Sequence, residues 1–159
     1  MDQAMRDREM ALEIARRVDA LGGRSFYVGG LVRDGLLGRE NKDVDIEIHG
    51  IHPQQLKDIL DALGQRITIG ESFGVFNLKG CHLDIAMPRK EEARGMGHKD
   101  FDIFVDPFIG TRAAACRRDF TMNALMQDVL TGEIVVLQAL TLVHSRYVNH
   151  YVMYMFQKQ

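Results

Sequence analysis

Apolar and polar positions along the chain repeat with two periods, one helical and one of two residues. The helical period predicts helices over residues 5–21, 31–37 and 53–63, each followed by a glycine, at Gly22, Gly38 and Gly64. The period of two predicts strands over residues 25–28, 43–48, 66–69, 74–78 and 82–86, and a hairpin over 125–136 that turns at Thr131-Gly132. Helices and strands therefore alternate through most of the chain, and no internal repeat interrupts them.

Two segments depart from this pattern. Residues 89–112 are rich in charge and glycine, which predicts a mobile loop that ends in the apolar stretch 101–108. After residue 135 an apolar stripe at helical spacing continues to the C-terminus, and only Glu133, Arg146 and Lys158 are charged in the last 27 residues. The stripe predicts a terminal helix packed on the core. The alternative is a surface for homo-oligomer formation, because so apolar a stripe is a liability when exposed.

Length and charge limit the classes of function. The 159 residues fit one domain with its own core, and the formal net charge is -2. A protein that binds nucleic acid by itself needs an excess of Lys and Arg, so any RNA-facing surface is local or supplied by another part. Cys81 and Cys116 have no metal-type spacing and are too few for a disulfide framework, which favours a cytoplasmic location. The charged N-terminus and the absence of an apolar run of about 18 residues predict no signal peptide and no membrane partner.

The strongest local signal for chemistry lies in the predicted strand 43–48. Its alternation directs Val44, Ile46 and Ile48 to the core and places Asp43, Asp45 and Glu47 together on the opposite face. Neighbouring carboxylates repel one another, and a bound cation relieves that repulsion. Mg²⁺ is the ion expected, since it prefers carboxylate oxygens and completes its shell with water and phosphates. The alternative is a solvated polar face without a ligand.

A glycine turn comes before this strand in the sequence, and a predicted short helix separates the two. Gly29-Gly30 follows the predicted strand 25–28, and Arg33-Asp34 comes just after it. Glycines let backbone N–H groups approach a phosphate closely, and the start of the next helix favours anions. Arg33 adds a charge-assisted contact, and Asp34 orients Arg33 or caps the turn. Alone the pair is an ordinary turn; joined to the aspartates of the next strand, it predicts a triphosphate–metal site.

Three ordered blocks between residues 25 and 135 resemble class II tRNA nucleotidyltransferases, the CCA-adding enzymes, and bacterial poly(A) polymerases. The first block covers residues 28–46, from Val28-Gly29-Gly30 to Lys42-Asp43-Val44-Asp45-Ile46. The second is Leu83 to Glu91, and the third is Arg117 to Leu125. The resemblance implies an α/β (strictly α+β) fold like the polymerase β head, with a small mixed sheet and helices on one face. It also implies a head domain over residues 1–135, followed by an unrelated tail over 136–159.

The resemblance assigns roles residue by residue. It implies that Asp43 and Asp45 hold catalytic Mg²⁺ ions and that Asp84 is the third acidic position. It implies a triphosphate site at Gly29, Gly30 and Arg33, and contacts to the sugar and phosphates from Arg118, Asp119 and Asn123. Two metals suit the chemistry, since one activates the RNA 3′-hydroxyl and the other stabilises pyrophosphate. Each assignment has a plainer alternative: Asp84 as an exposed strand residue, Arg117-Arg118 as surface charge, and Asp119 as a helix cap.

The resemblance ends near residue 135. The stretch that comes next in the family has no counterpart here. The Glu-Asp-x-x-Arg helix that selects CTP or ATP in the family and the RNA-holding domains are also missing from this sequence. A shifted reading frame, a truncation and a native short terminus all explain this. The expected function is nucleotidyl transfer from CTP or ATP to a tRNA or other RNA 3′-end, weak or lost without those parts. The alternatives are poly(A) addition, and a head that binds nucleotide and metal, or self-associates, without turnover.

Overall fold

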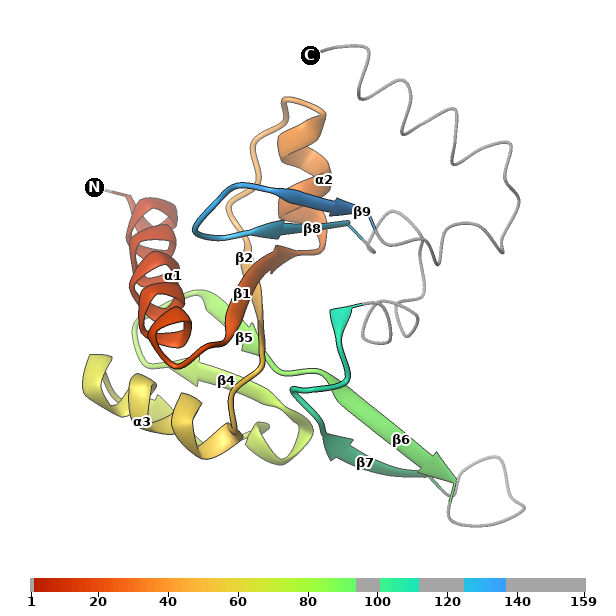
Figure 1. Cartoon of the computed structure of the whole chain (residues 1–159). Helices are drawn as coiled ribbons and strands as arrows, with labels where there is room; N and C mark the ends of the chain where they lie inside the picture. Colours follow the sequence, from red (N-terminus) through yellow and green to blue (C-terminus); the bar gives the residue numbers. More distant parts are fainter. Residues whose placement is uncertain (1, 94–100, 112–124, 137–159) are drawn as a thin grey trace, which may run out of the picture.

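The computed structural model describes residues 2–93, 101–111 and 125–136, and its centre is a seven-stranded mixed sheet (Figure 1). The strand order is β3-β4-β5-β2-β1-β8-β9. The bounds are Arg24–Val28 for β1, Val44–His49 for β2, Arg66–Ile67 for β3, Val75–Leu78 for β4, Leu83–Ala86 for β5, Leu125–Asp128 for β8 and Ile134–Val136 for β9. Within this sheet β2 and β5 run parallel, and the other neighbouring pairs are antiparallel.

Three helices cover one face of the sheet: α1 (Gln3–Ala20), α2 (Gly30–Leu36) and α3 (Pro53–Leu63) (Figure 1). The side chains of Val44, Ile46 and Ile48 on β2 are fully buried in the same cluster as the apolar faces of α1 and α3. Farther along the sheet, Val32 of α2 packs with Leu125 of β8. The expected fold, a small mixed sheet with helices on one face, is therefore confirmed. None of the helices in the described ranges is long and apolar enough to cross a bilayer.

The first helix illustrates how the sequence builds this layer. Asp2 caps it, because its carboxylate accepts a hydrogen bond from the Met5 N–H at 2.8 Å. A buried polar residue, Asp7, then ties the helix to the sheet. Its Oδ1 accepts hydrogen bonds from Gln3 Nε2 at 2.9 Å and from the His82 N–H at 3.1 Å, just before β5 begins. Because both contacts satisfy the buried carboxylate, α1 is fixed in rotation over the strands.

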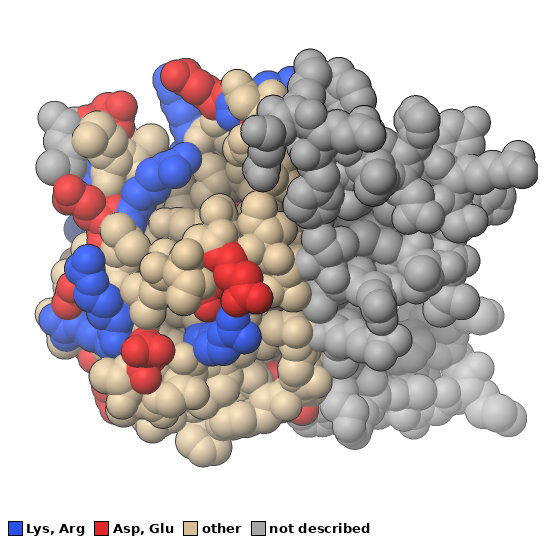
Figure 2. All heavy atoms as spheres, turned by 45° about the horizontal axis from the view of Figure 1, so that its top comes forward, with Lys and Arg blue, Asp and Glu red and all other residues tan. Residues whose placement is uncertain are grey.

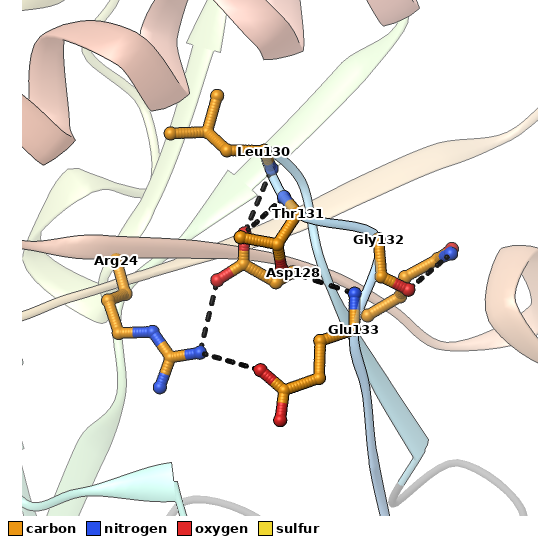
Figure 3. A network of polar contacts seen from close by, with 7 residues as sticks. Arg24, Asp128, Leu130, Thr131, Gly132 and Glu133 are labelled. Atoms are coloured by element: carbon orange, nitrogen blue, oxygen red, sulfur yellow. Dashed lines mark hydrogen bonds and ion pairs between the residues drawn. The ribbon is translucent and has the colours of Figure 1, made fainter.

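The turn between β8 and β9 is held by one carboxylate (Figure 3). Asp128 is 7% exposed, and its Oδ1 accepts hydrogen bonds from the N–H groups of Leu130 at 2.9 Å and Thr131 at 3.0 Å. Its Oδ2 accepts from Arg24 on β1 at 3.1 Å, and the same arginine lies 4.0 Å from Glu133. Burial by itself would raise the pKa of Asp128, but these donors outweigh it and hold the pKa below its usual value. The predicted hairpin is confirmed, and the carboxylate locks it to the sheet.

The structure corrects part of the prediction for residues 89–112, a mobile loop that ends in the apolar stretch 101–108. Residues Arg89–Ala93 form β6 and Phe101–Val105 form β7, an antiparallel two-stranded ribbon that extends away from the main sheet (Figure 1). The charged sequence of β6 has no alternating apolar pattern, so the sequence gives no strand signal there. The predicted strand 66–69 is also shorter, because Gly70 adopts a left-handed conformation and Ile69 is exposed. Of the predicted C-terminal tail, 136–159, the structure describes only Val136, which ends β9; residues 137–159 lie outside the described residues.

Candidate active site

Two carboxylates from strands far apart in sequence lie side by side in the sheet. Asp45 on β2 and Asp84 on β5 are partners in the parallel register. Adjacent residues in register point to the same face, so the two carboxyl groups meet on the face that the helices leave uncovered. The structure therefore places the aspartate strand beside Asp84, the third acidic position that the resemblance indicated.

The electrostatic environment of Asp45 is unfavourable to its ionised form. The pKa of Asp45 is raised to about 6, first by burial and then by the charge of Asp84, a hydrogen bond shared with Asp84 and the charge of Asp43. The three carboxylates thus act on one another. A site of this kind stores repulsion that a bound cation would relieve.

A neighbouring amide holds one of these carboxylates in place. Asn77 on β4 donates a hydrogen bond from Nδ2 to Asp84 Oδ1 at 2.8 Å, and the same group lies 3.3 Å from the carbonyl of Leu83. The amide fixes the rotamer of Asp84 without neutralising its charge. Asp84 is therefore oriented beside Asp45 rather than free to turn away from it.

The glycine turn lies against the same carboxylate pair. A Cβ atom built on Gly29 would be 3.5 Å from Asp45 Oδ2, so the backbone of the turn passes directly beside that oxygen. Gly29 has φ 72° and ψ -147°, a conformation open essentially to glycine alone. The two motifs that the sequence separates by a helix are thus neighbours in space, and the turn is built for close approach of a ligand to its backbone.

A hydrogen-bonded chain links the glycine turn to the start of β2. Arg33 donates from Nε to Asp34 Oδ1 at 3.1 Å, and Asn41 donates from Nδ2 to Asp34 Oδ2 at 2.8 Å. The bonds from Arg33 and then Asn41 lower the pKa of Asp34. Asn41 Oδ1 in turn accepts from the Asp43 N–H at 2.9 Å. The interpretation that Asp34 orients Arg33 is confirmed by this contact.

The carboxylate row of β2 does not remain exposed along its length. Glu47 is 9% exposed, and its Oε1 lies 2.7 Å from Nε2 of His49, itself 6% exposed. The hypothesis of a solvated polar face is therefore wrong for this end of the strand. Burial and ring contact with Phe26 explain it, because His49 packs edge-on against that ring at 5.4 Å between centroids.

A hollow of about 550 Å³ borders the site. Its walls come from the start of α1, the end of α2 and the segment 39–43, and they include Asn41 and Asp43. Gly29, Asp45 and Asp84 do not line it. We take the carboxylate pair, rather than this hollow, as the centre of the chemistry, because the pair carries the perturbed group and the glycine turn.

The predicted site residues divide into two groups. The structure brings together Gly29, Gly30, Arg33, Asp43, Asp45 and Asp84, whereas Arg118, Asp119 and Asn123 lie outside the described residues. Among the described residues no group of three His, Cys, Asp or Glu side chains forms a ready-made metal cage. Sequence reasoning missed Asn41 and Asn77. An asparagine two residues before an aspartate is a recognisable turn signal, whereas the contact of Asn77 depends on strand pairing.

Charge on the described surface is mixed. Figure 2 shows one face on which acidic and basic side chains are interspersed over the described residues, without a continuous basic patch there. This distribution agrees with the net charge of -2. The face seen there offers no broad electrostatic surface for an RNA backbone.

Known proteins similar in sequence to this chain belong to one family. Residues 25–138 match the family described as the poly A polymerase head domain. The chain is 33% identical over 127 residues to the multifunctional CCA protein of Methylobacillus flagellatus, covering 80% of this chain and 30% of that protein. It is 34% identical over 112 residues to the multifunctional CCA protein of Xylella fastidiosa, covering 70% and 26%.

Solved structures show the same similarity. The Bacillus stearothermophilus CCA-adding enzyme in complex with CTP has a TM-score of 0.62 and 28% identity, covering 86% of this chain and 30% of that one. A tRNA nucleotidyltransferase complexed with a primer tRNA and an incoming ATP analog has a TM-score of 0.56 and 26% identity, covering 80% and 35%. The chain thus spans 26–35% of the length of these relatives.

Proposed function

Because the chain belongs to the poly A polymerase head domain family, we propose that it binds a nucleoside triphosphate with Mg²⁺ and transfers the nucleotidyl group to an RNA 3′-end. The proposed donors are CTP and ATP, and the proposed acceptor is tRNA. Support comes from similar structures that hold CTP, or a primer tRNA with an ATP analog. Addition of poly(A) is the alternative reaction of the same chemistry.

The observation that carries the proposal is the adjacency of the acidic pair and the glycine turn. Asp45 and Asp84 are in register across β2 and β5, and the Gly29 backbone lies beside Asp45. A structural carboxylate pair gains nothing from a strained glycine turn packed against it. A site for a metal-bound triphosphate would need both, because the glycine backbone would let phosphates approach closely and the carboxylates would hold the metal.

The donor set fits Mg²⁺. Carboxylate oxygens are the ligands this ion prefers, and it is usually bound through one or two carboxylates plus substrate phosphates rather than by an all-protein cage. The absence of a three-ligand cluster among the described residues agrees with that mode. Asp43 and Asp45 would hold the metal, with Asp84 oriented beside them by Asn77. When bound, Mg²⁺ supplies activation of the 3′-hydroxyl and stabilisation of the developing charge on the phosphates.

The residues of the chain itself position the donor. Gly29 and Gly30 offer a backbone surface without side chains, and the Arg33 guanidinium folds over this turn, with Nη2 3.3 Å from a Cβ built on Gly30. Arg33 would hold phosphate oxygens by charge-assisted hydrogen bonds. With the nucleotide so fixed, the RNA 3′-hydroxyl gives its proton to water and its oxygen bonds to the α-phosphorus. The bond from that phosphorus to the oxygen shared with the β-phosphate breaks, and pyrophosphate leaves. Arg118, Asp119 and Asn123 remain predicted contacts to the sugar and phosphates.

The test is extension of a labelled tRNA that lacks its CCA end, with CTP, ATP and Mg²⁺. We expect weak extension by the wild-type chain, and a loss of about a hundredfold or more in the Asp43→Ala/Asp45→Ala variant, since electrostatic contributions of this kind are large. Asp58→Ala is the matched control, because Asp58 is an exposed carboxylate on α3, on the other face of the sheet. It should extend the tRNA as the wild type does.

The products separate the candidate functions. Addition of CCA supports the proposal, and a run of adenylates would replace it with poly(A) addition. A second candidate is a head that binds nucleotide and metal without turnover, which the mixed charge on the surface in Figure 2 favours. That candidate predicts Mg²⁺-dependent CTP binding by calorimetry and no extension. Neither extension nor Mg²⁺-dependent binding would contradict both.

A further inference from the structure

We propose that Asn41 is a positioning residue, whose side-chain amide fixes the metal-binding residue Asp43 relative to the phosphate-binding turn that carries Arg33. The role assigned to Asn41 rests on the proposed function. Asn41 itself touches neither substrate nor metal in this role. It acts through the two groups that it joins.

The side-chain amide of Asn41 accepts one hydrogen bond through its oxygen and donates another through its NH₂ group. Its Oδ1 accepts the hydrogen bond from the Asp43 N–H at 2.9 Å, and its Nδ2 donates to Asp34 Oδ2 at 2.8 Å. Rotating the amide by half a turn would set its oxygen against the Asp34 carboxylate and its NH₂ against an N–H donor. One orientation therefore satisfies both contacts, and an aspartate or an alanine at this position cannot make both.

Asp43 needs such a support because the sheet does not hold it. Strand β2 begins at Val44, and the register with β5 likewise begins at Val44. The segment 37–43 between α2 and β2 has no regular secondary structure. The contact from Asn41 closes a turn of the asparagine type over Asp43, which replaces the missing ladder hydrogen bond. The position of the first acidic residue thus depends on Asn41 rather than on strand pairing.

The other end of the link reaches the phosphate-binding turn. Asp34 accepts a hydrogen bond from Asn41 Nδ2 on Oδ2 and another from Arg33 Nε on Oδ1. All of these groups meet over Gly30, where an added Cβ would lie 3.1 Å from Asn41 Nδ2 and 3.3 Å from Arg33 Nη2. The guanidinium, the carboxylate and the amide are therefore packed as one unit above a residue without a side chain. Displacing Asn41 would free the Asp43 N–H and, at the same time, one oxygen of the carboxylate that orients Arg33.

Variants of Asn41 are expected to fold. Asn41 is half-buried and lines the hollow of about 550 Å³, so water can reach Asp34 when the amide is removed. Asn41→Asp keeps the contact to the Asp43 N–H but sets a carboxylate against Asp34. Lys42→Gln is the matched control, because it changes the charge by the same amount one residue away. The structure gives the Lys42 side chain no hydrogen bond or ion pair to the described residues.

The exchange variant Asp34→Asn/Asn41→Asp tests the link itself. It keeps the total charge, restores a donor and an acceptor between positions 34 and 41, and preserves an acceptor for Arg33 and for the Asp43 N–H. A double-mutant cycle over these variants isolates the interaction from each single effect. The measurement is the affinity for CTP in the presence of Mg²⁺, by titration calorimetry on the whole chain, with the thermal midpoint recorded for each variant.

We expect Asn41→Asp to weaken CTP binding by about tenfold, the size typical of a lost hydrogen bond to a charged group. The exchange variant should recover to within about threefold of the wild type, and Lys42→Gln should stay within the same range. A wild-type affinity in both Asn41→Asp and Asn41→Ala overturns the inference. So does an exchange variant as weak as the single one, or a loss of affinity that follows the thermal midpoint. A wild-type chain that binds no CTP with Mg²⁺ instead overturns the proposed function, and with it the role of Asn41.

Discussion

Asp45 and Asp128 occupy the same sheet and the same face, with β1 between their strands, yet their surroundings are opposite. Asp45 has carboxylates as its charged neighbours, and its pKa is raised to about 6. Asp128 has Arg24 and two backbone N–H groups of its own turn, and its pKa is lowered (Figure 3). Burial disfavours the charge of both, so the difference lies in the partners.

The comparison separates a carboxylate that stabilises the fold from one that the fold holds at a cost. Asp128 completes a turn and needs no ligand, because its oxygens are already satisfied by the hairpin and by Arg24. Asp45 weakens the folded state when ionised, which is the pattern of a group kept for binding rather than for stability. A raised pKa beside other carboxylates, as at Asp45, therefore indicates a binding site more clearly than the lowered pKa of Asp128 does.

The largest expected effect is on ligand binding. Asp45→Asn should weaken Mg²⁺-dependent CTP binding by about a hundredfold or more, since it removes a half-buried negative charge that would face the cation. Asp128→Asn should leave the affinity within about threefold, because the turn of β8 and β9 lies on the far side of β1 from the acidic pair. Calorimetric titration at pH 7.5 and 15 °C measures both. Equal losses of affinity in the two variants would show that Asp45 has no special role in binding compared with Asp128.

The next effect is on stability, and here Asp128 rather than Asp45 is the residue whose loss matters. Asp128→Ala should lower the free energy of unfolding by about 2–3 kcal/mol, because two backbone donors and Arg24 lose their acceptor. Glu133→Ala is the control, since Glu133 is exposed and lies 4.0 Å from Arg24; it should cost about 0.5 kcal/mol or less. Urea denaturation reports both values. A loss below about 1 kcal/mol for Asp128→Ala would mean that the turn forms without its carboxylate.

The smallest effect is a gain in stability at the site. Asp45→Asn should raise the free energy of unfolding of the metal-free chain by about 1 kcal/mol at pH 7.5. The full shift of the pKa would give about 3 kcal/mol, which is reduced because Asp45 is partly exposed to solvent. The folded state binds the proton more tightly than the unfolded chain, so stability is highest below pH 3.8 and falls as pH rises to about 6.

The gain from Asp45→Asn should accordingly disappear near pH 4, where the wild-type carboxyl is protonated. Urea unfolding with EDTA at pH 4, 5, 6 and 7.5 tests this dependence. A gain that is the same at all four values would trace to packing rather than to charge. A destabilising effect at pH 7.5 would show that Asp45 is held by donors after all.

Local patterns predicted much of the fold. The alternation in strand 43–48 correctly buries Val44, Ile46 and Ile48, and the helical period correctly buries Ile14 and Val18. These predictions succeed because a period of two or of 3.6 residues follows directly from backbone geometry. The ribbon of β6 and β7 was not predicted, because β6 has a charged sequence without an alternating apolar pattern and the two strands pair outside the main sheet.

The site was predictable only in part. Asp43 and Asp45 stand out by themselves, but their union with Asp84 depends on the parallel pairing of β2 and β5, which no local period encodes. The resemblance to a known family supplied that link at the level of sequence. The supports Asn41 and Asn77 were not predicted, because each acts through a contact set by tertiary packing. The burial of Glu47 against His49 likewise depends on which strands flank β2.

The parallel pairing of β2 with β5 also has a kinetic consequence. Helix α3 and strands β3 and β4 lie between the two strands in sequence, so this contact is non-local and closing it costs loop entropy. The repulsion between Asp45 and Asp84 begins only at that step. If β5 docks before the rate-limiting barrier, protonation at pH 5 speeds refolding relative to pH 7.5; if it docks afterwards, protonation slows unfolding instead. The limb of the chevron plot that moves with pH therefore dates the assembly of the site within the folding reaction.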